Sequence, residues 1–350
     1  MTHPYKAQPE QAFWSRAVSK NWTPSQTITG AGPILRTGDR IASAGSCFAA
    51  NLVPYLKRNG FTYVETETRH PSFADLEIDK FSYDKFSAAY GNLYTARQFL
   101  QLLERALGRF KPTEDRWYAD GEVIDPFRPG MNYRARSDRE FDALTAQHLA
   151  CVRQAFTEAN VVIFTLGLTE AWLSADDNAV FPACPETVAG VFDPARHLFH
   201  NFTVSEIVQD LHKVHATLKE LRPDVRLILT VSPVPLVATA TAQHVLVSSI
   251  YSKSVLRAAC GEFCGANPDV TYFPSYEIIT GPQAPYDFFE DDRRNASQTG
   301  VDEVMGAFLA NCELAATQTA PEPARPRPNR AKMLSRIMTD AECEEAAADA

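Results

Sequence analysis

The sequence predicts an α/β fold: a three-layer α/β/α sandwich with a central parallel β-sheet. The first observation is a set of short apolar runs, rich in β-branched or aromatic residues, that end at Gly, Ser or Pro as buried parallel strands do. They lie at 40–44, 161–166, 225–231 and 270–273, with 61–67 as a fifth candidate. The second is that segments with helical spacing alternate with these runs, which is typical of parallel sheets. They lie at 48–59, 94–107, 141–159, 204–221 and 247–263.

Local signals support these elements in chain order. The strand at 40–44 (RIASA) leads into the helical segment 48–59, which Gly60 ends as a C-cap. Pro54 lies inside that segment and is expected to kink the helix or delay its start, because proline has no backbone N–H. The later runs, such as VVIFTL at 161–166, are almost wholly apolar, which predicts strands buried on both faces.

The domain organisation is expected to be simple. An N-terminal extension at 1–37 should pack on one domain that covers 38–317. Within it, the segment 69–136 lacks a clear strand–helix alternation and is expected to form an insertion over the site. Residues 318–330 contain four prolines and no large apolar residue, so 318–350 should be a mostly disordered tail, Pro/Ala-rich and acidic.

Composition and charge exclude several classes. The 34 Lys and Arg against 43 Asp and Glu give a net charge of −9, which argues against a general nucleic-acid partner. The chain has no run of 18 apolar residues and no basic-then-apolar start, so neither membrane insertion nor a secretory signal is expected, and a cytoplasmic location is predicted. Seven cysteines spread over 350 residues do not resemble a disulfide framework.

Chemistry is expected in the loops that follow the strands, because parallel sheets bind ligands at the carboxyl ends of their strands. After the first strand comes Gly45-Ser46-Cys47, which places Cys47 at or near a helix N-terminus. There the helix dipole and free N–H groups favour a thiolate and can stabilise an oxyanion. The alternative is a small buried residue where strand and helix meet.

Polar residues follow the other strands as well. Gly167, Thr169 and Glu170 come after the second strand, where a turn with an N-cap is the alternative interpretation. His244 lies between the third strand and the next helix, and it is either a general base or an exposed loop histidine. Glu277 follows the fourth strand and either orients a base or is solvated.

The strand followed by GSCFA at 45–49 resembles the name-giving motif of the GSCFA family. Further segments typical of that family follow in order: YGNLYTARQ (90–98), FTLGLTEAW (164–172), LTVSPVPL (229–236), YSKSVLRA (251–258) and YFPSYEI (272–278). The chain is therefore identified as a member over about 38–310. The family is related to the SGNH (GDSL-like) hydrolases, α/β/α (flavodoxin-like) enzymes that cleave or transfer the acyl groups of esters.

The resemblance implies a site. It places Cys47, not Ser46, at the nucleophile position, and Gly91 at the position whose N–H serves the oxyanion hole. Thr169 stands where these hydrolases have an asparagine, and Asn92 is expected to supply the missing amide. The expected oxyanion and substrate-binding residues are Ser46, Gly91, Asn92, Gly167, Thr169 and Glu170.

The final block of the hydrolases, Asp-x-x-His, is missing. The nearest segment is Asp292-Arg293-Arg294-Asn295, and no histidine follows His244. His244 is therefore the expected base, with Glu277 to orient it. A cysteine depends on its base less than a serine does, because some thiolate exists at neutral pH.

The expected function is that of an acyl-ester hydrolase or O-acyltransferase that acts through Cys47. Its substrate would be a small-molecule or saccharide ester, with an acyl donor in the case of transfer, and no cofactor or metal is expected. The alternative is a non-catalytic module that binds a glycan or an acyl ligand and has lost the Asp-x-x-His block.

Two other patterns have simpler explanations. His197-x-x-His200 and His212-x-x-His215 superficially suggest zinc, but the first pair lies in a loop-like segment and no cysteine or carboxylate joins them with ligand spacing. The segment 252–254 (SKS) resembles part of a Ser/Lys site. At the start of a predicted helix, capping and a solvated Lys253 explain it better.

Overall fold

The central sheet of the protein has five parallel strands. The computed structural model describes residues 3–28, 30, 32–68, 85–131 and 134–314, so the expected tail at 318–350 lies outside the described residues. The strand order is β10-β9-β5-β1-β2, and every neighbouring pair is parallel. The strands are β1 (Arg40–Gly45), β2 (Thr62–Tyr63), β5 (Val161–Leu166), β9 (Arg226–Val231) and β10 (Val270–Tyr272).

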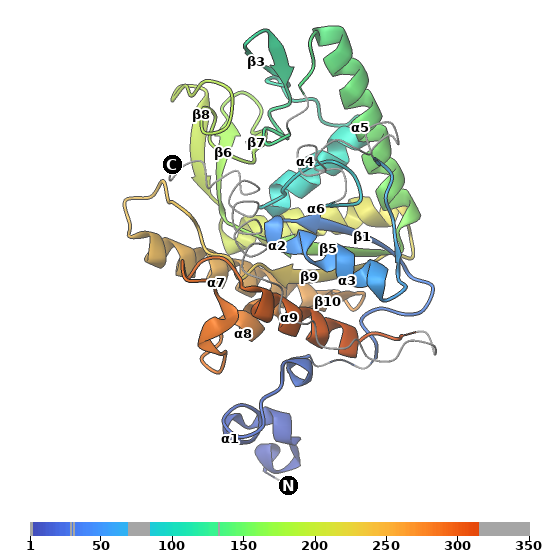
Figure 1. Cartoon of the computed structure of the whole chain (residues 1–350), viewed down its shortest axis with the longest axis vertical. Helices are drawn as coiled ribbons and strands as arrows, with labels where there is room; N and C mark the ends of the chain where they lie inside the picture. The colour runs from blue at the N-terminus through green and yellow to red at the C-terminus, as the bar shows by residue number, and fades with distance from the viewer. Residues whose placement is uncertain (1–2, 29, 31, 69–84, 132–133, 315–350) are drawn as a thin grey trace, which may run out of the picture.

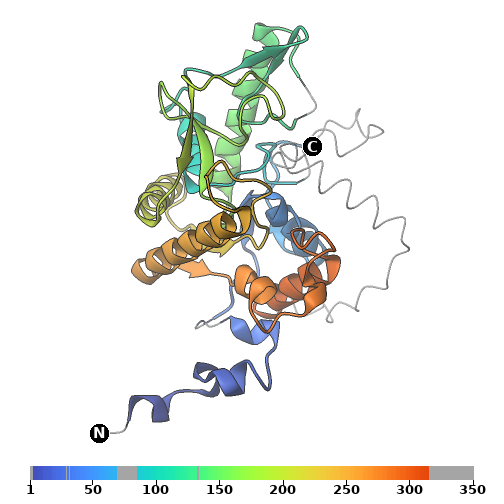
Figure 2. The ribbon, with the colours of Figure 1, turned by 90° about the vertical axis from the view of Figure 1, so that its left-hand side faces the viewer.

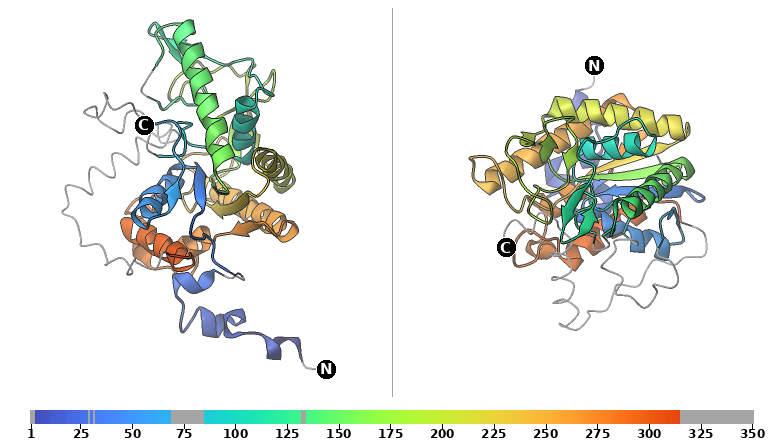
Figure 3. Two further views of the ribbon diagram at one scale, coloured as in Figure 1. Left: turned by 90° about the vertical axis from the view of Figure 1, so that its right-hand side faces the viewer. Right: turned by 90° about the horizontal axis from the view of Figure 1, so that it is seen from above.

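Helices cover both faces of this sheet (Figures 1 and 3). One layer contains α4 (Ala96–Ala106), α5 (Asp138–Glu158), α6 (Val204–Leu221) and α7 (Val245–Ala266). The other contains α2 (Cys47–Ala50), α3 (Leu52–Arg58), α8 (Ser275–Thr280) and α9 (Gln298–Ala310). Along β5, Phe164 and Leu166 pack in the first layer and Val161 and Ile163 in the second. The predicted α/β/α sandwich is confirmed.

The expected helix at 48–59 is divided in two. Helix α2 ends at Ala50, and α3 begins at Leu52 after Asn51. Pro54 is therefore in the first turn of α3, where the missing N–H removes no helical hydrogen bond. Proline delays the start of the helix, as expected, rather than kinking it.

A second, antiparallel region was not predicted. Strands β6 (Glu170–Ser174), β7 (Val180–Phe181) and β8 (His197–Asn201) form a sheet in the order β7-β6-β8. Strands β3 (Trp117–Ala119) and β4 (Glu122–Ile124) form a hairpin. Together with the first half of α5, these strands lie at the end of the molecule opposite the N-terminal segment (Figures 1 and 2).

The segment expected as an insertion at 69–136 contains a core helix. The ring of Phe99 in α4 lies 4.8 Å from that of Phe164 in β5, centroid to centroid. Of the described part of this segment, the β3–β4 hairpin lies outside the sandwich (Figure 1).

Among the described helices, none has the length and apolar composition needed to cross a membrane.

The N-terminal extension packs on the domain through its second half. The short helix η3 (Pro24–Thr27) lies against α9, where the Asn311 side chain donates to the carbonyl of Ser25 (3.1 Å). The preceding helices have no buried residue and project from the body (Figure 2). They are η1 (Pro4–Ala7), η2 (Glu10–Ala12) and α1 (Trp14–Ala17).

Hydroxyl groups hold the middle of β1. Ser43 Oγ and Tyr63 OH share a hydrogen bond of 2.7 Å, and the Ser43 N–H donates to Ser87 Oγ (3.2 Å). Tyr90 OH donates to the Ser43 carbonyl. Burial raises the pKa of both phenols, so they stay neutral donors at physiological pH. These bonds fix the strand that delivers the candidate nucleophile.

Gly45 at the end of β1 should not tolerate a side chain. Its φ is +149°, and a Cβ there would lie 2.7 Å from both Cβ and O of Thr165. We expect Gly45→Ala to lower the free energy of unfolding by about 2–4 kcal/mol through overpacking and backbone strain. Urea denaturation measures this change.

Gly306→Ala is the matched control, because Gly306 is an exposed glycine of α9 where an added Cβ would have no described atom within 4 Å. It should stabilise the protein by about 0.5–1 kcal/mol. Equal denaturation midpoints for Gly45→Ala and the wild type would contradict the account.

Candidate functional site

The exit of β1 places Cys47 at the carboxyl edge of the sheet. Gly45 ends the strand, Ser46 occupies the N-cap position of α2 in an extended conformation, and Cys47 is the first residue of the helix. Ser46 is 3% exposed, whereas Cys47 is partly exposed. The position predicted for Cys47, after the strand and at a helix start, is the one observed.

A loop from the next part of the chain joins the exits of β1 and β5. The Leu93 N–H donates to the Gly45 carbonyl (2.8 Å). The Tyr94 carbonyl accepts from the N–H groups of Gly167 (2.8 Å) and Leu168 (3.1 Å). The backbone of Leu93 and Tyr94 therefore bridges two neighbouring strand ends.

This bridge brings several predicted site residues together. Gly91 and Asn92 directly precede Leu93, and Gly91 has a φ of +68°, a conformation that favours glycine. A Cβ on Gly167 would lie 3.3 Å from the Ser46 Cβ and 3.2 Å from the Tyr94 ring. Gly167 thus permits the close approach of the two strand exits.

Helix α7 holds the turn that follows β5. The Ser252 hydroxyl accepts the Thr169 N–H (3.0 Å), and the Lys253 ammonium donates to the Gly167 carbonyl (2.6 Å). Lys253 is only 3% exposed, so the expectation of a solvated lysine at a helix start is wrong. Helix α7 begins at Val245, about two turns before Lys253. A stripe of small hydroxyl residues on α7, Ser248, Ser249 and Ser252, was the available sequence signal for this buried polar face.

Two buried hydroxyls at this edge of the sheet have no hydrogen-bond partner among the described residues. The N–H groups of Gly167, Leu168 and Thr169 all have acceptors, so this turn offers no free amide to a ligand. The hydroxyls of Ser46 and Thr169 are buried and have no hydrogen-bond partner within the described chain. Buried polar groups are rarely left without a partner, so both hydroxyls are candidates for contact with a ligand.

Glu170 serves the neighbouring loop. Its carboxylate accepts from the Thr239 hydroxyl (2.7 Å) and from the Ala240 N–H (3.2 Å). Glu170 is the first residue of β6, and these bonds tie the loop between β9 and α7 to that strand.

His244 lies at the same sheet edge but is used as a helix cap. Its neighbour Val245 packs against a small hydrophobic cluster of Tyr94, Leu168 and Leu236. The His244 ring is exposed, and its Nδ1 accepts the N–H of Leu246 (3.2 Å). This is the one hydrogen bond that its side chain makes to described residues.

Glu277 is bonded elsewhere. Its carboxylate accepts from Arg257 Nε (2.5 Å) and from Tyr272 OH (2.9 Å). The guanidinium of Arg257 also lies over the Tyr272 ring, 4.0 Å from its centroid. Glu277 therefore supports the packing of α7 against β10, and the described contacts do not join it to His244.

The segment 292–295, where the hydrolases have Asp-x-x-His, forms a closed turn. Asp292 accepts from the backbone N–H (3.0 Å) and from the side-chain amide (2.7 Å) of Asn295. Although burial opposes it, these bonds and that from the Arg294 N–H hold the pKa of Asp292 below its usual value. Phe289 and Ala296 flank the turn and belong to the same hydrophobic cluster as Phe48.

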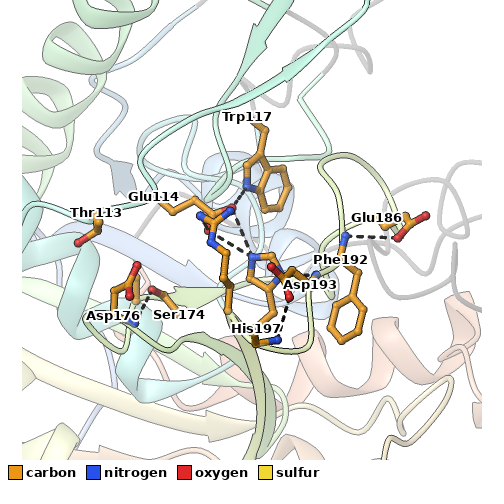
Figure 4. Close-up of polar contacts among 12 residues, drawn as sticks. Thr113, Glu114, Trp117, Ser174, Asp176, Glu186, Phe192, Asp193 and His197 are labelled. Carbon is orange, nitrogen blue, oxygen red and sulfur yellow. Dashed lines mark hydrogen bonds and ion pairs between the residues drawn. The ribbon is translucent and has the colours of Figure 1, made fainter.

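The histidine pairs do not converge on a metal. His197 and His200 lie on β8, where residues three apart point to opposite faces. His197 is held by Glu114 (3.2 Å) and by the Asp193 N–H (3.0 Å) (Figure 4). His200 is held by Glu206 (2.8 Å). Within the described ranges, no three His, Cys, Asp or Glu side chains are grouped to hold a metal ion.

Comparison with solved structures finds proteins of low similarity. A GDSL-like lipase from Bacteroides thetaiotaomicron VPI-5482 has 12% identity and a TM-score of 0.37, covering 78% of this chain and 86% of its own. A family 3 carbohydrate esterase from Clostridium thermocellum has 10% identity and a TM-score of 0.32, covering 78% and 94%. One from Talaromyces cellulolyticus has 11% identity and a TM-score of 0.34, covering 77% and 93%. Similarity at this level carries no conclusion about the reaction.

The family comparison is stronger. No curated protein matches the chain. The family model named GSCFA matches residues 40–308, from the start of β1 almost to the end of α9. This range is most of the 350 residues and includes all the elements that form the sheet edge described above. The chain belongs to the GSCFA family.

Proposed function

We propose that the protein is an acyl-ester hydrolase or O-acyltransferase in which Cys47 is the nucleophile. The observation that carries the proposal is the position of Cys47, a partly exposed thiol at a helix start directly after Ser46. The buried hydroxyls of Ser46, at the exit of β1, and of Thr169, in the turn after β5, have no partner among the described residues. The helix start favours a thiolate, which is the reactive form.

The proposed reaction has two steps. The base removes the Cys47 proton, the thiolate attacks the ester carbonyl carbon, the bond to the alcohol oxygen breaks, and the alcohol leaves with the proton that the base returns. The resulting thioester then reacts with water to give an acid, or with an acceptor hydroxyl to give a new ester. Either route returns the thiol. The substrate class we propose is a small-molecule or saccharide ester.

The groups around Cys47 would stabilise the oxyanion. We assign this role to the Gly91 N–H, the Asn92 side chain and the Thr169 hydroxyl, and substrate contact to Ser46. Preorganised donors of this kind typically contribute a hundredfold or more to the rate. Gly167 contributes by lacking a side chain, because its N–H already donates to Tyr94.

His244 is the proposed base. Because its Nδ1 accepts an N–H in the structure, its proton would sit on Nε2, and catalysis requires the ring to release Leu246 and turn toward Cys47. Glu277 has no role in this scheme, since both of its carboxylate oxygens are bonded to other residues.

The second candidate function is a non-catalytic module for a glycan or acyl ligand. The observation that favours it is the closed turn between Asp292 and Asn295, which contains no imidazole. The two functions differ in what Cys47 does. A binding module keeps its ligand affinity when the thiol is removed, whereas the enzyme loses turnover.

Removal of the thiol tests the proposed reaction directly. Cys47→Ala should lower hydrolysis of p-nitrophenyl acetate at least about a hundredfold, because the covalent route is lost. Cys151→Ala is the control, since Cys151 is another partly exposed cysteine, in α5, and burial raises the pKa of its thiol. It should retain wild-type turnover. Equal loss in both variants, or none in Cys47→Ala, would exclude Cys47 as the nucleophile.

The proposed role of His244 as a base can be tested separately from its role as a helix cap. His244→Asn keeps a good N-cap residue but removes the base, so stability should hold while acylation slows at least about tenfold. His244→Ala should slow acylation equally and also destabilise by about 1 kcal/mol. Stopped-flow release of p-nitrophenol gives the acylation rate. An Asn variant as fast as the wild type would remove His244 from the mechanism.

Lys253 is predicted to position the turn after β5. Lys253→Met removes the bond to the Gly167 carbonyl and should lower kcat about tenfold with little change in KM, because the bond fixes geometry rather than substrate. Lys213→Met, on the exposed side of α6, is the control. An unchanged kcat in a folded Lys253→Met variant would argue against this positioning role.

A further inference from the structure

Arg105, at the end of α4, is a buried cation that lacks an acceptor among the described residues. It is only 7% exposed, and within the described chain its guanidinium makes no hydrogen bond or ion pair. It is stacked on Phe127, with Cζ 4.2 Å from the ring centroid. Burial lowers the pKa of Arg105. A buried guanidinium is ordinarily paired, so this one needs an explanation.

The carboxylates close to Arg105 are already bonded to other groups. Asp125 accepts from Arg128 Nε (2.8 Å) and from the Phe127 N–H (2.9 Å). Asp115 accepts from Arg116 Nε (2.9 Å) and from Arg116 Nη2 (3.1 Å). Asp125 attracts Arg105 through space, but it does not occupy the guanidinium N–H groups.

Arg105 borders a cavity between α4, β7 and the loop at 126–129. The lining includes Leu93, Gln98, Gln101, Phe127, Arg128 and His148. The two glutamines do not serve Arg105. Gln101 bonds to the backbone of Asn178 and Val180, and the Gln98 carbonyl oxygen accepts from the N–H groups of Tyr94 and Thr95.

We propose that this cavity is a binding site for a carboxylate or phosphate group, with Arg105 as its principal donor. The planar guanidinium offers two parallel N–H groups, which match the oxygens of either anion. Phe127 holds the guanidinium plane in place. Arg128 lies on the same wall, but its charge is already paired with Asp125 (2.8 Å), so Arg105 is the donor left for a ligand.

The site adjoins the candidate active site without being part of it. Leu93 lines the cavity, and its N–H bonds to the Gly45 carbonyl at the exit of β1. An anion bound at Arg105 would therefore share the cavity with Leu93, the residue that directly follows Gly91 and Asn92. The inference does not depend on the reaction proposed for Cys47.

Anion titration of the full chain tests the proposal. Isothermal titration and thermal unfolding would be followed with sodium phosphate and with sodium acetate, against sodium chloride at equal ionic strength. The wild type should bind one of the first two saturably, with a rise in Tm that chloride does not produce. A larger response to acetate identifies a carboxylate ligand, and a larger response to phosphate identifies a phosphate ligand. No saturable binding of either anion would overturn the proposal.

Variants assign the binding to Arg105. Arg105→Met, which has a long apolar side chain to contact Phe127 but no charge and no N–H groups, should lose the anion-dependent rise in Tm. Arg109→Gln is the control. Arg109 lies just after the end of α4, is exposed, and pairs with Glu220. If Arg105→Met does not fold, Arg105→Lys serves, with an affinity at least about tenfold weaker because the fork is lost. Wild-type affinity in the folded Arg105 variant would refute the assignment.

Discussion

The backbone of Leu93 and Tyr94 is the bridge on which the candidate site depends. It is bonded on one side to the exit of β1 and on the other to the exit of β5. Such a bridge requires the two exits to approach closely, which the absence of side chains at Gly45 and Gly167 allows. A peptide N–H and a carbonyl thus bring separate chain segments to one edge of the sheet.

Helix α7 supplies the second constraint. The Lys253 ammonium and the Ser252 hydroxyl reach from this helix to the turn after β5 and use its polar backbone groups. Burial of an ammonium is unfavourable unless it is hydrogen-bonded, and the Gly167 carbonyl meets that need. The hydroxyls of Ser46, which precedes Cys47, and of Thr169, in the turn after β5, then remain as buried groups without a partner in the described part of the chain.

Much of this arrangement could be predicted from the sequence, because it follows from local patterns. Apolar runs located the five strands, and the glycine turn after the first one located Cys47. The β6–β8 sheet could not be predicted in this way, since its strands are short, mixed in polarity and paired through contacts distant in sequence. The partners of Glu277 and His244 depend likewise on where α7 and α8 begin, and local patterns locate helix ends poorly.

The central claim is that Cys47 carries the acyl group. The most direct measurement is peptide mass spectrometry of the protein quenched in acid during reaction with an activated ester. The account predicts an acyl group on the peptide that contains Cys47. This group should be lost when hydroxylamine, which cleaves thioesters, is added. An acyl group found on Ser46 or on another cysteine, or no covalent adduct during turnover, would contradict it.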